Sequence, residues 1–155
     1  MELQPLERGQ LGVMLVRSIL VALVLLGAAA IPAFATADET GIAPGLILGG
    51  LALLLAYPVL VSPIRRYRSW GYALGDDELR LSHGIWTHLD TVVPLRRVQH
   101  LDVAQGPIER TFGVTRLVLH TAGTMNSQIV LPGLSRNSAE GIRDEIRAQI
   151  RQEPE

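Results

Sequence analysis

The chain has 155 residues, of which 48% are hydrophobic and 19% are charged, and its formal net charge is −1. This length suits one domain with additional segments, and the near-zero charge argues against a protein that binds nucleic acid. The sequence has no cysteine, which excludes disulfides, thiolate metal sites and cysteine nucleophiles.

Two long uncharged stretches, 18–37 and 40–64, occupy the N-terminal part of the chain. A helix rises about 1.5 Å per residue, so each stretch is long enough to cross a bilayer core of about 30 Å. We predict two spans, at about 18–37 and 43–62, that form a helical hairpin. The hairpin makes up an N-terminal membrane domain, residues 1–64.

Arginines flank the hairpin at its two open ends: Arg8, Arg17, Arg65, Arg66 and Arg68. The link between the spans carries only the acidic Asp38 and Glu39. The positive-inside rule therefore predicts a protein of the cell membrane with both termini in the cytoplasm. Arg65, Arg66 and Arg68 are also candidate contacts for anionic lipid headgroups, worth about 1 kcal/mol each.

A signal peptide is the alternative to the first span. Ala33-Phe34-Ala35 resembles a signal-peptidase site behind an apolar core. Against cleavage, the segment before the core is long and contains the acidic Glu2 and Glu7. The apolar stretch also reaches full spanning length, so we favour a retained span.

From Trp70 onward, short alternating stretches are separated by turn residues, which is typical of β-strands. We predict six antiparallel strands at 70–74, 79–83, 85–93, 97–105, 114–121 and 128–131. A single helical turn, 108–112, ends at Gly113, and Pro132-Gly133 separates the sheet from a last helix with Asn137 as its N-cap. We expect Trp70, Tyr72, Leu117, Leu119, Ile142 and Ile146 to share one core.

One motif gives this half of the chain a family resemblance. Its residues are Pro94, Arg97, Val98, Gln99, His100, Gln105, Gly106, Pro107, Arg110, Phe112, Gly113, Thr121, Ala122 and Gly123. In order and spacing the motif resembles that of the bacterial pleckstrin-homology-like (YdbS-like) membrane protein family. The resemblance implies a two-helix transmembrane hairpin followed by a mainly β pleckstrin-homology-like (PH-like) domain, residues 65–155, closed by a C-terminal α-helix. It implies structural roles for the motif residues Pro94, Arg97, Gln99, His100, Gly106, Arg110, Gly113 and Gly123.

The sequence offers no catalytic, cofactor or metal site. The four histidines, His83, His88, His100 and His120, have no carboxylates at ligand spacing, so ordinary surface or hydrogen-bonded roles are favoured. Asp76, Asp77 and Glu78 are adjacent carboxylates at an expected hairpin turn, where acidic residues are common. We therefore expect no enzyme and no cofactor.

Four arginines near the motif are candidates for an interaction site. Arg97 and Arg110 are expected to hold the turn by pairing with Asp102, Glu109 or backbone carbonyls. Arg96 and Arg116 are the candidate docking residues.

These features favour a membrane-anchored interaction module. Its partners are the lipid bilayer and, as the resemblance implies, another membrane protein, one candidate being a protein with related PH-like domains. The alternative is binding of anionic lipid headgroups at the cytoplasmic membrane surface.

Overall fold

The computed structural model describes residues 3–122 and 128–152 and divides into two compact units. The helical unit contains residues 14–65, and the β unit contains residues 1–13 and 66–155.

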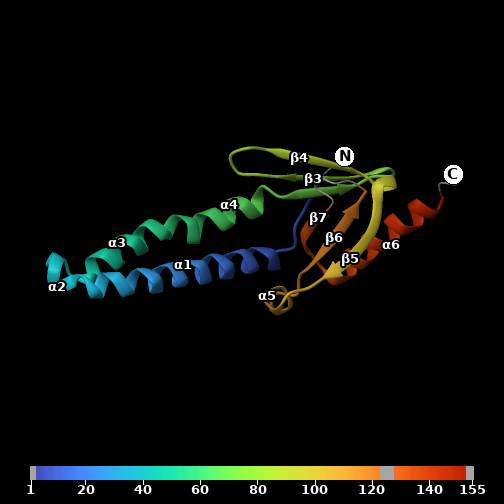
Figure 1. Cartoon of the computed structure of the whole chain (residues 1–155). Coiled ribbons are helices and arrows are strands. Elements are labelled where there is room, and N and C mark those ends of the chain that lie inside the picture. Colours follow the sequence, from blue (N-terminus) through green and yellow to red (C-terminus); the bar gives the residue numbers. More distant parts are fainter. Residues whose placement is uncertain (1–2, 123–127, 153–155) are drawn as a thin grey trace. The chain divides into compact units, whose positions relative to one another are not determined.

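The helical unit is built from the helices of the first half of the chain, whose outer ends, residues 9–13 and 66–68, belong to the β unit (Figure 1). In order these are α1 (Gly9–Ala35), α2 (Ala37–Thr40), α3 (Pro44–Ala56), a π-helical turn η1 (Tyr57–Val61) and α4 (Ser62–Arg68). The continuous helical segments Gly9–Ala35 and Pro44–Arg68 are each long and apolar enough to cross a membrane. The predicted pair of apolar N-terminal helices is confirmed. The helices extend beyond the predicted spans at their arginine-bearing ends.

The π-helical turn has a local cause in the sequence. Pro58 lacks a backbone N–H and cannot continue the regular ladder of α-helical hydrogen bonds. The helix widens over Tyr57–Val61 and then resumes as α4. Within this unit, Arg65 donates a hydrogen bond from Nη1 to the Tyr57 hydroxyl over 3.2 Å.

The β unit contains two antiparallel sheets and a C-terminal helix. One sheet has the order β1 (Gln4–Pro5), β2 (Gly71–Leu74), β3 (Glu78–His83) and β4 (Leu89–Pro94). A 3₁₀ turn, η2 (Leu95–Arg97), leads into the other sheet, β5 (Val98–Ala104), β6 (Thr115–Thr121) and β7 (Gln128–Leu134). A short helix, α5 (Pro107–Thr111), joins β5 to β6, and α6 (Arg136–Gln152) follows β7 (Figure 1). Antiparallel strands followed by a C-terminal helix confirm the predicted fold class.

Side chains from both sheets and from α6 form one hydrophobic core. Tyr72, Leu117, Leu119 and Ile146 are buried in it, and the partly buried Trp70 and Ile142 pack against it. All six residues that we expected to share a core do so. Helix α6 lies against β6, β5 and η2, so its apolar stripe closes the sheets.

The N-terminal segment belongs to the β unit, whereas the sequence analysis grouped it with the membrane hairpin. Strand β1 pairs with β2, and the Leu6 side chain is buried in the core. The Tyr67 hydroxyl donates to the Leu6 carbonyl over 2.8 Å, and the Glu7 N–H donates to the Gly133 carbonyl over 2.8 Å. Burial raises the pKa of Tyr72, and the nearby Glu7 carboxylate raises that pKa further. Strand β1 was not predicted, because two residues carry no periodic signal.

Two strand boundaries differ from the prediction. The third strand was expected from residue 85, but β4 begins at Leu89, because Gly84, at φ 127°, starts a bend that continues to His88. The last strand was expected to stop at residue 131, but β7 continues through Pro132 to Leu134. An edge strand tolerates proline, and a shift of register between Thr115 and Leu117 accommodates the extra residue.

The N-cap of α6 also differs from the prediction. Asn137 was expected there, but it lies in the first turn, and Ser135 precedes the helix. The Ser135 hydroxyl accepts a hydrogen bond from the Ser138 N–H over 3.1 Å. Serine is as good an N-cap as asparagine, so composition alone did not choose between them.

Candidate functional site

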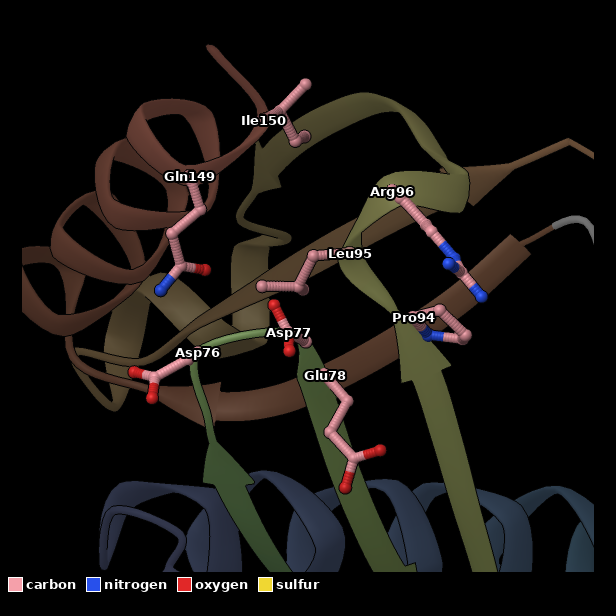
Figure 2. A pocket seen from close by; sticks show the side chains of 8 residues that line it. All are labelled: Asp76, Asp77, Glu78, Pro94, Leu95, Arg96, Gln149 and Ile150. Atoms are coloured by element: carbon pink, nitrogen blue, oxygen red, sulfur yellow. The ribbon is translucent and has the colours of Figure 1, made fainter. Parts of the chain in front are cut away.

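An open cavity of about 610 Å³ lies where α6 meets the turn between β2 and β3 (Figure 2). It is lined by Asp76, Asp77, Glu78, Pro94, Leu95, Arg96, Gln149 and Ile150. The Leu95 N–H donates to the Asp77 carbonyl over 2.9 Å, which fixes η2 against the turn. The volume lies within the range of about 300–1,000 Å³ that is usual for ligand sites.

Gln149 is a lining residue of this cavity with an unsatisfied hydrogen-bond acceptor. Its Oε1 atom is buried and has no hydrogen-bond partner among the described residues. Figure 2 shows Gln149 reaching from α6 toward the β2–β3 turn, with Leu95 beside it. A buried acceptor without a partner costs about 1–3 kcal/mol, so a shift of the Gln149 side chain that brings Oε1 to a donor on a bound molecule would be stabilising.

A second cavity, of about 230 Å³, shares Ile150 with the first. It is lined by Val98, Gln99, His100, Leu101, Arg147 and Ile150. We call the two cavities together the α6 groove. The β-strand wall of the second cavity is β5, which forms one edge of its sheet. An edge strand presents backbone donors and acceptors that are able to pair with an added strand.

The charges of the α6 groove differ between its two ends. At one end, Asp76, Asp77 and Glu78 contribute three carboxylates to the lining and Arg96 contributes one guanidinium; Glu78 is paired with Arg80 over 2.8 Å. At the other end, Arg147 is the charged residue of the lining. The groove therefore offers an acidic end, an apolar middle around Leu95 and Ile150, and a basic end.

The second half of the sequence motif forms the turn around α5. The Glu109 carboxylate is buried. Its Oε2 atom accepts a hydrogen bond from the Gly106 N–H over 2.6 Å. The Glu109 Oε1 lies 3.5 Å from the Arg116 Nη1. Gly113, at φ 67°, ends the turn as predicted. Arg116, expected to dock a partner, thus contacts the carboxylate that orders this turn.

Several of the remaining predicted residues lie outside the groove and the α5 turn. Arg97 and Arg110 are exposed, and within the described part of the chain neither guanidinium has a carboxylate within 4.0 Å. Arg66 and Arg68 are exposed in α4. Gly123 lies outside the described residues. Pro94, Gln99 and His100, which the family resemblance marks as structural, line the α6 groove.

His83, His100 and His120 have local partners. His100 and His120 are directly opposite on β5 and β6, and the Asp102 carboxylate lies 3.7 Å from the first and 3.3 Å from the second. His83 stacks on Trp70 with ring centroids 4.4 Å apart. In residues 3–122 and 128–152, no cluster of three or more His, Asp or Glu side chains is arranged to hold a metal ion.

Sequence reasoning missed the position of Asp102 beside two histidines, and it missed the contribution of Gln149 and Leu95 to the groove. Asp102 is two residues from His100, and side chains at that spacing share one face of a strand, so the alternation was a usable signal. Gln149 and Leu95 gave no such signal. They become part of the groove only because α6 folds back over the β2–β3 turn.

Comparisons with known proteins agree with this architecture. The model of the family described as "Bacterial PH domain" matches residues 10–150. The chain is 32% identical over 101 residues to the UPF0699 transmembrane protein YdbS of Bacillus subtilis (strain 168), covering 64% of this chain and 62% of that protein. It is 27% identical over 100 residues to the UPF0699 transmembrane protein YdbT of the same strain, covering 63% of this chain and 20% of that protein. The matched regions thus span less than two thirds of either relative. No solved structure matches significantly.

The chain has two apolar helices of spanning length and a β unit that is closed by an amphipathic helix. Together these features define a membrane protein with a small β-rich module. The family match covers nearly the whole chain, including both helices. The chain belongs to the bacterial PH domain family and is similar to the YdbS-like transmembrane proteins.

Proposed function

We propose that the chain is a membrane-anchored, non-catalytic interaction module whose α6 groove docks a segment of another membrane protein. The observation that carries this proposal is the groove itself. It has the volume of a ligand site, an apolar middle and a buried acceptor, Gln149, without a partner among the described residues. Motif residues of the family line both of its cavities.

The chemistry of the groove favours an extended polypeptide as the occupant. A strand added along the edge of β5 would gain main-chain hydrogen bonds, while its side chains entered the two cavities. Its N–H groups or a cationic side chain would suit the Gln149 acceptor and the carboxylates of Asp76 and Asp77, and an acidic side chain on it would suit Arg96. The partner class we propose is a transmembrane protein with a related PH domain. YdbT, a transmembrane protein of the same strain as YdbS, is similar to this chain over a fifth of its own length.

The acidic residues at the groove support docking rather than catalysis. Asp76 and Asp77 are exposed on a turn, whereas a catalytic carboxylate pair needs environments that separate the two pKa values. Among the described lining residues of that cavity there is no histidine, serine, threonine or lysine to act with them.

Exchanging one of two adjacent arginines tests the groove. We expect Arg96→Glu to reduce co-purification of the partner from native membranes about tenfold, because the reversed charge faces the docked segment. Arg97→Glu is the matched control, since Arg97 is exposed and does not line the cavity. Both variants should keep the melting temperature of the parent chain. Equal loss in the two variants, or no loss in either, would reject the α6 groove as the docking site.

We further propose that both termini lie in the cytoplasm of a cell-membrane protein. The chain leaves the β unit after Val13 and returns to it at Arg66, which supports an even number of crossings. The arginines at these two ends favour the cytoplasmic side. Cleavage after Ala35 would remove β1 and Leu6 from the β unit, which argues for retention of the first helix.

Cysteine labelling tests this topology, because the chain has no cysteine of its own. In intact cells, a membrane-impermeant maleimide should label Thr40→Cys in α2 and leave Asn137→Cys in α6 unlabelled. Asn137 is exposed, so its cysteine should react once the cells are lysed. Labelling of Asn137→Cys in intact cells would show that the β unit lies outside the cytoplasm and would contradict the proposed orientation.

Attraction to anionic lipid is a second candidate function, and the observation that favours it is the exposure of Arg66 and Arg68 at the end of α4. Each contributes about 1 kcal/mol near an anionic surface. Such attraction weakens at high salt, whereas docking in the groove depends on shape and hydrogen bonds as well. We assign these arginines an accessory role beside the groove.

A further inference from the structure

The loop between β3 and β4 exposes apolar side chains. Trp86 is 86% exposed, and Leu89 at the start of β4 is 53% exposed. Residues 84–89 contain no acidic residue, lysine or arginine. A water-facing tryptophan among uncharged neighbours is uncommon on a surface that contacts only solvent.

The base of this loop is attached to the segment that follows the second apolar helix. The Ser69 hydroxyl donates to the Arg66 carbonyl over 2.9 Å and accepts the Gly84 N–H over 3.4 Å. The Trp70 ring stacks on His83, the last residue of β3. Ser69 directly follows α4, so it lies within one helical turn, a rise of about 5 Å, of the exposed Arg66 and Arg68.

The opposite end of β3 leads to the α6 groove. Strand β3 has six residues, which corresponds to about 20 Å at the usual rise. One end of the strand adjoins Glu78 and the groove, and the other adjoins the Trp86 loop. Figure 1 shows β3 and β4 as a hairpin closed by this loop.

We propose that the β3–β4 loop is a second membrane anchor, in which Trp86 inserts into the interfacial region of the leaflet from which α4 emerges. Tryptophan prefers this depth, because its ring is apolar and its indole N–H is polar. Arg66 and Arg68 supply positive charge at the same end of the β unit, which complements anionic headgroups. The inference does not depend on which protein, if any, the groove binds.

A lipid surface fits the loop better than a protein partner. The apolar residues lie next to a chain segment that continues directly into a helix of spanning length, so a bilayer is always within reach. The β unit would then be attached to the membrane at two points, through α4 and through Trp86. Such a restraint would hold the groove end of β3 away from the bilayer.

Tryptophan fluorescence of the full chain in vesicles tests the proposal, because the chain has two tryptophans. The Trp70→Phe variant reports Trp86 alone. In phosphatidylcholine–phosphatidylglycerol vesicles, we expect blue-shifted emission and several-fold weaker quenching by aqueous acrylamide than in a water-facing control. Lipids brominated near the headgroup should quench the Trp86 emission more than lipids brominated near the ends of the acyl chains.

The control places a tryptophan on the exposed Ala148 of α6, as Ala148→Trp with Trp70→Phe and Trp86→Phe. The emission of Trp86 is also obtained with the Trp70–His83 stack intact, by subtracting the spectrum of Trp86→Phe from that of the unmodified chain. Acrylamide quenching of Trp86 equal to that of the control would overturn the proposal. Protection of Trp86 in native membranes but not in vesicles would also overturn it, because a protein would then cover the loop.

Discussion

Replacing Ile146 with aspartate should unfold the β unit. Ile146 has no exposed surface, and it packs against the core strands from α6. The substitution removes a buried aliphatic side chain and places an unpaired carboxylate in the core, at a cost of about 4 kcal/mol or more. That cost is a large part of the total stability of a small domain, about 5–15 kcal/mol.

Thermal unfolding of the full chain in detergent is the measurement for this variant. Ala148→Asp is the matched control, since it adds the same charge two residues away on the exposed face of α6. The control should melt close to the parent chain, whereas Ile146→Asp should show no cooperative transition of the β unit. Equal melting of both variants would mean that α6 does not close the sheets.

The second large effect concerns the attachment of the N-terminal segment. Gly133 and Gly113 both have left-handed backbones, with φ of 68° and 67°. A Cβ at Gly133 would lie 2.7 Å from the Gln10 Cβ, whereas a Cβ at Gly113 would have nothing within 4 Å. Gly113→Ala therefore measures the backbone strain alone, about 1–2 kcal/mol. Gly133→Ala adds a steric clash of about 1–3 kcal/mol.

We expect Gly133→Ala to lower the stability clearly more than Gly113→Ala, as measured by denaturant unfolding of the full chain. Deletion of residues 1–7 should abolish the difference, because it removes Leu6 and β1 and releases the start of α1 from β7. Equal destabilisation by the two substitutions would show that Gln10 does not pack on Gly133 in solution.

The parts of the fold that could be predicted are those with local signals. Long uncharged stretches predicted the helices, and alternation predicted most strands of the β unit. The turn at α5 was predicted because Gly106-Pro107 begins it and Gly113 ends it, each for a backbone reason that the residue type determines.

What escaped prediction depends on contacts between distant segments. Strand β1 exists because Gln4 and Pro5 meet β2, more than sixty residues away. The α6 groove exists because Gln149 and Ile150 are folded against the β2–β3 turn. The ion pair between Arg116 and Glu109 requires β6 to return beside α5, so sequence spacing did not reveal it.

Site-specific photo-crosslinking in native membranes tests the central claim, that the α6 groove docks another membrane protein. A photoreactive amino acid at Ile150 lies in the groove, and the same amino acid at the exposed Ala148 lies outside its lining. We expect one discrete adduct from Ile150, containing a second transmembrane protein with a PH domain, and no adduct from Ala148. Absence of an adduct at Ile150, or the same adducts from both positions, would contradict it.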